Sequence, residues 1–124
     1  MTRSSDHRAS VRGRLVSATA YSLAGLRAAF RHEQAFRLEL LVLAFVIPAG
    51  LWLGRTGVQR ALLIGSWCMV IVVELLNSAI EVVVDHLWPE RDARAGRAKD
   101  ICSAAVFSAI VLSIAVWLLV LVTP

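Results

Sequence analysis

The chain has 124 residues, which is enough for one domain. It is 58% hydrophobic and 18% charged, with a mean hydropathy of +0.70, whereas about a quarter of an average soluble domain is charged. This composition excludes an ordinary soluble domain and indicates a membrane protein, and the net charge of +4 does not indicate a nucleic-acid partner, because the basic residues gather in segments between apolar runs.

Residues 1–35 are predicted to form a cytoplasmic tail followed by a surface helix. Residues 1–10 are polar and are expected to be disordered at the start, and the pattern from 12 to 35 is amphipathic. Arg14 and Tyr21 share one side of the predicted helix. At about 100° per residue, the opposite side carries a narrow apolar stripe of Leu15, Val16, Leu23, Leu26 and Phe30. A basic amphipathic helix of this kind lies in the membrane interface.

The first predicted membrane span covers residues 36–54. Its uncharged core, 40–53, is shorter than the roughly 20 residues that a span needs, so the span must begin near Phe36 and include Arg37 and Glu39. A tight turn at 54–60 follows.

The second predicted span, 61–85, and the third, 101–122, are longer. The third carries no charge in 22 residues and is the clearest transmembrane signal in the chain. Residues 86–100 between them are predicted to be a polar loop, with Pro89 and Gly96 as helix breakers.

The basic residues predict the orientation of the three spans. Seven of the thirteen lie in 1–37 and four in 91–99. Since loops rich in arginine and lysine stay in the cytoplasm, the N-terminus and the 86–100 loop are predicted to be cytoplasmic and the C-terminus periplasmic. Trp88 would then lie at the inner interface, and Trp52 and Trp117 toward the outer one.

The second span carries a polar stripe on one face. With Glu74 at 0° on a helical wheel, the others fall within about 60° of it. The members are Asn77, Ser78, Glu81 and Asp85. Carboxylates inside a span are costly and indicate function, although a structural polar seam between helices is the alternative.

Further charged groups are expected at the cytoplasmic level of this stripe. They are Glu33, Glu39, Lys99 and Asp100. The carboxylate oxygens of this group, together with those of Glu81, suit Mg2+, which binds through one or two carboxylates plus phosphates. Glu74 lies about 10 Å deeper in the membrane and is a plausible general base. The arrangement fits transfer of a polar group from a soluble donor to a lipid hydroxyl, and no phosphate-binding glycine loop is present in the sequence.

Three segments resemble the prokaryotic diacylglycerol kinase family. They are "VELLNSAIEVVVD" (73–85), "GRAKDICSAAV" (96–106) and "AYSLAGLRAAFRHEQAFRLEL" (20–40). The resemblance covers residues 14–122, and the combination of ExxNxAxE with AKD is highly specific.

The resemblance implies an all-α fold with an N-terminal surface helix and three transmembrane helices. It also implies a homotrimer in the bacterial inner membrane, with active sites shared between subunits at the cytoplasmic interface. Such enzymes use ATP and Mg2+ to phosphorylate a lipid hydroxyl. Diacylglycerol, which gives phosphatidic acid, is the expected substrate here, and undecaprenol, the substrate of a sister branch, is the nearest alternative.

The resemblance also implies a role for each matching residue. Glu74 would be the base that deprotonates the lipid hydroxyl, with Asn77 ordering that site. Glu33 and Glu81 would hold the metal that bridges the ATP phosphates. The nucleotide contacts would be Arg14, Tyr21, Glu90, Lys99 and Asp100, and the positions near the lipid would be Glu39 and Ser103.

The chain departs from the family pattern at three places. Ser17 and Ala24 stand where familiar members carry lysines, and the loop "HLWPERDARA" (86–95) differs throughout. None of these changes removes a metal or base candidate. A small proton-coupled transporter is the alternative of another class, but it needs its carboxylate near the midplane of the membrane, and here the carboxylates gather at the cytoplasmic end.

Overall fold

The computed structural model describes the backbone of residues 3–123 and the side chains of residues 10–123. The chain divides into two structural units, Met1–Glu33 and Gln34–Pro124. The first unit is one helix, α1 (Arg3–His32). It includes residues 3–10, which the sequence predicted to be disordered, while residues 1–2 lie outside the described part. The apolar side chains of the predicted stripe are all exposed.

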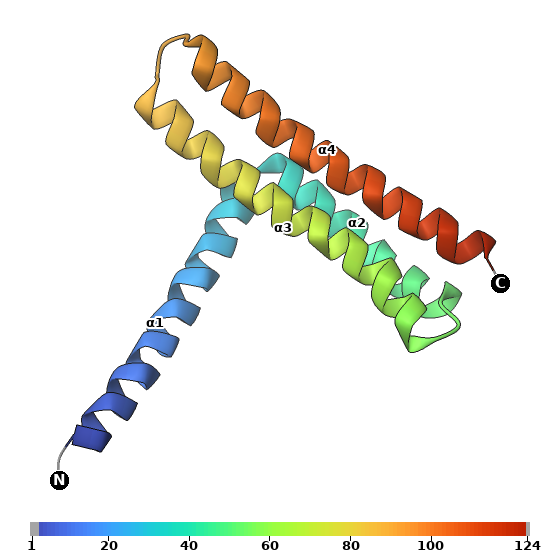
Figure 1. Ribbon diagram of the computed structural model, residues 1–124, viewed down its shortest axis with the longest axis horizontal. Coiled ribbons are helices and arrows are strands. Elements are labelled where there is room, and N and C mark those ends of the chain that lie inside the picture. The colour runs from blue at the N-terminus through green and yellow to red at the C-terminus, as the bar shows by residue number, and fades with distance from the viewer. Residues whose placement is uncertain (1–2, 124) are drawn as a thin grey trace. The chain divides into compact units, whose positions relative to one another are not determined.

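The second unit consists of α2 (Gln34–Leu53), α3 (Gly57–Leu87) and α4 (Ala93–Val122) (Figure 1). α3 packs against both α2 and α4. Each helix is long and apolar enough to cross a membrane. The all-α fold with three membrane-spanning helices that the sequence predicted is therefore confirmed, and each predicted span overlaps one of these helices.

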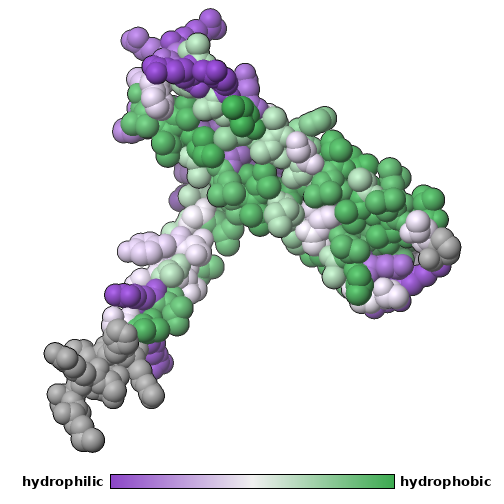
Figure 2. Space-filling view, viewed as in Figure 1, coloured by the Kyte–Doolittle hydropathy of each residue, from purple (hydrophilic) through white to green (hydrophobic). Residues whose placement is uncertain are grey.

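The surface of this unit is apolar between two polar ends. Figure 2 shows hydrophobic side chains over the middle of the three helices and hydrophilic ones near the α3–α4 loop and near the α2–α3 turn. Many large apolar side chains on α2, α3 and α4 are exposed, among them Phe45, Leu76 and Phe107. In water such a band would be unfavourable, but lipid tails or neighbouring subunits can cover it.

The α2–α3 turn is closed by local hydrogen bonds. Thr56 caps the N-terminus of α3 by accepting from the Gln59 amide, and the Gln59 side chain accepts from the Arg55 amide at 2.8 Å. The Arg60 guanidinium donates to the Gly54 carbonyl at 3.0 Å. A Cβ on Gly54 would lie 2.8 Å from the Gly50 carbonyl oxygen, so the turn requires glycine there.

The α3–α4 loop is shorter than the sequence predicted. α3 continues to Leu87, and α4 begins at Ala93, so only residues 88–92 of the predicted 86–100 loop lack helical structure. The reason is the carboxylate of Asp92, which accepts from the amides of Arg94 and Ala95 at 2.8 and 3.1 Å and starts α4 before the apolar stretch begins. Gly96 is helical and does not break the chain.

Hydrogen bonds between side chains and backbone join the helices inside the apolar band. The Trp67 indole donates to the Glu39 carbonyl, and the Trp117 indole donates to the Leu63 carbonyl, both at 3.0 Å. The hydroxyls of Ser66 and Ser113 are also 3.0 Å apart. Because apolar burial gives little driving force in lipid, such bonds and close packing hold membrane helices together. Trp117 thus joins α4 to α3, a role that the sequence did not predict.

Candidate functional site

The polar stripe of α3 is buried at the end that contains Glu74 and Ser78. Glu74 and Ser78 are only 5% and 6% exposed. The Ser78 hydroxyl donates to the Glu74 carboxylate at 3.5 Å, which is a long and weak hydrogen bond. The side-chain oxygen of Asn77, one turn from Glu74, is buried and has no hydrogen-bond partner. A buried acceptor of this kind is costly unless a ligand or another chain supplies a donor.

Glu39 on α2 faces this part of α3. It is 8% exposed, and one of its carboxylate oxygens has no hydrogen-bond partner. Its carboxylate lies near that of Glu74 on α3. The sequence placed Glu39 at the level of Glu81, but the structure places it beside Glu74, because the hydrogen bond from Trp67 fixes the register of α2 on α3.

The shallower end of the stripe faces α4 and is open to solvent. The Lys99 ammonium donates to the Asp85 carboxylate at 2.8 Å, and both side chains are substantially exposed. Lys99 precedes the uncharged stretch that begins at Ile101. The hydrogen bond to Asp85 and the charge of Asp85 raise the pKa of Lys99, with a smaller contribution from Glu81, so the ammonium stays charged at physiological pH.

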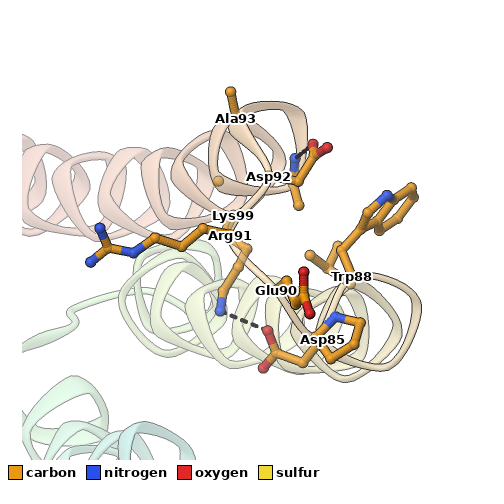
Figure 3. A pocket seen from close by; sticks show the side chains of 11 residues that line it. Asp85, Trp88, Glu90, Arg91, Asp92, Ala93 and Lys99 are labelled. Carbon is orange, nitrogen blue, oxygen red and sulfur yellow. Dashed lines mark hydrogen bonds and ion pairs between the residues drawn. The ribbon is translucent and has the colours of Figure 1, made fainter.

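A pocket of about 450 Å³ lies at the α3–α4 loop (Figure 3). Its volume is in the range of about 300–1,000 Å³ that is usual for small-molecule sites. The charged or aromatic residues that line it are Asp85, Trp88, Glu90, Arg91, Asp92 and Lys99. The structure therefore brings together Glu90 and Lys99, two of the predicted nucleotide contacts. Asp100 and Ser103 are exposed on the first turns of α4.

The remaining predicted site residues belong to the first unit. Arg14 and Tyr21 are exposed on α1, and Glu33 directly follows its last residue. The Glu33 amide donates to the Ala29 carbonyl at 2.8 Å, the last helical hydrogen bond at this end of α1.

No group of three or more His, Cys, Asp and Glu side chains that could hold a metal ion is found among the residues that the structure describes. The half-exposed Glu81 and the exposed Asp85, one turn apart on α3, offer carboxylate oxygens beside Lys99. They suit a hard cation that arrives with phosphate oxygens, because Mg2+ needs only one or two protein carboxylates in such sites.

Two residues gain a role that the sequence did not give them. Asp85 and Ser78 were placed on the polar face but assigned no function, and the structure pairs them with Lys99 and Glu74 respectively. Spacing could have indicated the Ser78 contact, since residues four apart on a helix are neighbours. The Asp85 contact depends on how α4 returns along α3, which no local pattern reports.

The chain is similar to known proteins over most of its length. Residues 20–121 match the family described as prokaryotic diacylglycerol kinase. The diacylglycerol kinase of Haemophilus influenzae is 46% identical over 103 residues, covering 83% of this chain and 87% of that protein. The diacylglycerol kinase of Escherichia coli K12 is 44% identical over 108 residues (87% and 88%), and that of Helicobacter pylori 26695 is 36% identical over 104 (84% and 81%). The similarity includes α2, α3 and almost all of α4.

Proposed function

This chain belongs to the prokaryotic diacylglycerol kinase family of lipid kinases, and from this membership we propose that it transfers the γ-phosphate of ATP to diacylglycerol with Mg2+ as the metal. The product is phosphatidic acid. The chain is a multi-pass bacterial membrane protein, so its lipid substrate is available within the bilayer.

The observation that carries the proposal is the order of groups along α3. Glu74 is buried within the apolar band, Glu81 follows two turns later, and Asp85 holds Lys99 at the edge of the pocket. A lipid hydroxyl can reach Glu74 from the bilayer. A charged nucleotide can reach Lys99 and Asp85 from water. Phosphoryl transfer mostly needs such positioning and charge neutralisation.

In the proposed mechanism, the carboxylate of Glu74 accepts the proton of the lipid hydroxyl while the hydroxyl oxygen forms a bond to the γ-phosphorus and ADP leaves. Asn77 and Ser78 orient this end of the site. Lys99 binds phosphate oxygens, and Glu39 and Ser103 lie on the lipid side. Arg14, Tyr21, Glu90 and Asp100 contact the nucleotide.

Glu33 and Glu81 would hold the metal. When bound, Mg2+ would neutralise charge on the phosphates of ATP. The exposed carboxylates beside Lys99 support this assignment because they supply the hard oxygen ligands that the ion prefers.

We also propose a homotrimer with a cytoplasmic active site. The exposed apolar side chains of the three spans support contacts between copies of the chain. The basic residues near the α3–α4 loop support its cytoplasmic placement.

The test is phosphate transfer from ATP by purified protein in mixed micelles, with diacylglycerol and undecaprenol offered in parallel and Mg2+ varied. We expect labelled phosphatidic acid, and we expect Glu74→Gln to abolish turnover while leaving ATP binding largely intact. Labelled undecaprenyl phosphate in its place would keep the mechanism and change the substrate. Loss of ATP affinity with normal turnover in Glu74→Gln would contradict the role of Glu74 as the base. If a folded protein gave no lipid product, a transport or structural role for the carboxylates would be favoured instead.

A further inference from the structure

Trp88 lines the wall of the α3–α4 pocket. Trp88 caps the C-terminus of α3, where its backbone leaves the helical conformation (φ −128°, ψ 75°) and its amide donates to the Val84 carbonyl at 2.9 Å. The residue is 45% exposed. Of the described residues that line the pocket, it is the only aromatic one.

The three other tryptophans have different surroundings. Trp67 and Trp117 donate their indole N–H groups to backbone carbonyls of neighbouring helices and hold the helices together. Trp52 is 85% exposed near the end of α2, at the α2–α3 turn. α3 is 31 residues long, so this turn is about 45 Å from the α3–α4 loop. Trp88 thus differs from Trp67 and Trp117 in its exposure and from Trp52 in lining the α3–α4 pocket.

We propose that Trp88 stacks on the base of the nucleotide that donates the phosphate. This assignment rests on the proposed function, because it takes ATP as the donor. Aromatic rings bind bases through their π-faces, and each such contact contributes measurably to affinity.

The order of groups on α3 sets the direction of the nucleotide. The phosphate that is transferred must lie toward Glu74, which is in the apolar band. Lys99, held by Asp85, offers the positive charge that phosphates need. Trp88 follows Asp85 by three residues and lies farther from Glu74. The base, at the opposite end of the nucleotide from the transferred phosphate, therefore reaches the part of the pocket that Trp88 lines.

The close-up view agrees with this direction. In Figure 3 the Trp88 indole and the Arg91 guanidinium lie on opposite sides of the view, with Glu90 and the Lys99–Asp85 pair between them. The pocket thus offers a flat aromatic surface and a cation in one volume of about 450 Å³. A nucleotide needs both, whereas a bare phosphate needs only the cation.

The competing role for Trp88 is that of an anchor in the membrane interface, where tryptophan is also common. An anchor would contact lipid head groups and would not respond to nucleotide. A stacked indole would lose fluorescence when a base covers it. The two roles therefore differ in which added molecule changes the signal.

The experiment uses the full chain in mixed micelles. Tryptophan fluorescence is titrated with ATP and with inorganic tripolyphosphate, for the wild type, Trp88→Phe and the control Trp52→Phe. We expect ATP to quench the wild type and Trp52→Phe, the quench to disappear in Trp88→Phe, and tripolyphosphate to have no such effect. In the transfer assay, Trp88→Ala should raise the KM for ATP about 10-fold with little change in kcat, and Trp88→Phe should restore most of the affinity.

Inhibition by tripolyphosphate shows whether Trp88→Ala is folded, since its inhibition constant should equal that of the wild type. An unchanged KM for ATP in Trp88→Ala would overturn the proposal, as would an ATP-dependent quench that survives in Trp88→Phe. Quenching of the Trp88 signal by brominated lipids but not by ATP would assign Trp88 to the membrane and also overturn it. A Trp88-dependent quench by ATP without any phosphate transfer would support the stacking contact and contradict the proposed function instead.

Discussion

At the scale of single residues, Glu74 has neighbours from two helices. The Ser78 hydroxyl donates a weak hydrogen bond to its carboxylate, and the carboxylate of Glu39 on α2 lies nearby. The position of the Glu74 carboxylate in the proposed reaction therefore depends on residues of both α2 and α3.

Replacing Ser78 tests this arrangement. We expect Ser78→Ala to lower kcat about 2- to 10-fold with an unchanged KM for ATP, because one modest hydrogen bond to the base is lost and the pocket is untouched. The measurement is steady-state phosphate transfer to diacylglycerol. Ser108→Ala is the matched control, since that exposed hydroxyl only bonds to the Ala104 carbonyl of its own helix. An equal effect of both variants would mean that Ser78 acts on general stability and not on Glu74.

Glu81 allows a second prediction about a single side chain. We expect Glu81→Ala to raise strongly the Mg2+ concentration that gives half-maximal activity, because an oxygen ligand near the phosphates is lost. A Mg2+ titration at saturating ATP measures this. Asp85→Asn is an informative comparison, since it removes a charge one turn away and releases Lys99. If the Mg2+ titration of Glu81→Ala matched that of the wild type, the metal site would have to lie elsewhere.

At the scale of helices, the contact between α2 and α3 depends on a close approach at Gly50. A Cβ on Gly50 would lie 2.8 Å from Cγ1 of Ile64 and 3.4 Å from Cβ of Leu63. The same pair of helices carries the hydrogen bond from Trp67 to the Glu39 carbonyl and brings Glu39 near Glu74. A small residue is thus needed at this position for packing and indirectly for the site.

Replacing single glycines by alanine tests whether a small residue is needed at position 50. We expect Gly50→Ala to lower the melting temperature in detergent, because relieving the contact with Ile64 costs about 1–3 kcal/mol. Gly65→Ala is the control, since no atom lies within 4 Å of its Cβ position, and alanine there should favour the helix by about 0.5–1 kcal/mol. Adding Ile64→Ala to Gly50→Ala should recover part of the loss. Equal melting temperatures for both single variants would show that α2 and α3 are not closely packed at Gly50.

The sequence predicted the helices better than their ends and contacts. Long apolar stretches identified the spans, although only the third is free of charge, because a bilayer requires about 20 predominantly apolar residues in a helix that crosses it. The loop after α3 was predicted too long, since Asp92 starts α4 within a polar stretch that looked irregular. The angular positions of Glu74, Ser78 and Glu81 followed from helical periodicity alone. Helical periodicity did not predict that Glu39 lies near Glu74 or that Asp85 is the partner of Lys99, because both contacts depend on how one helix lies along another.

At the scale of the whole molecule, the orientation in the membrane decides whether ATP can reach the α3–α4 pocket. The pocket lies at the α3–α4 loop, beside Arg91, Arg94, Arg97 and Lys99. The opposite end of the same helices carries Arg55 and Arg60. The larger number of basic residues near the loop predicts that the loop faces the cytoplasm, where ATP is present.

Cysteine labelling in right-side-out vesicles tests this orientation. The starting variant replaces the two free cysteines, Cys68 and Cys102, by alanine. We expect an added Cys at Val58, exposed at the start of α3, to react with an impermeant maleimide in intact vesicles. A Cys at Ala93, exposed at the start of α4, should react only after permeabilisation. The reverse pattern would place the pocket outside the cell, away from cytoplasmic ATP, and would contradict both the orientation and the choice of ATP as the donor.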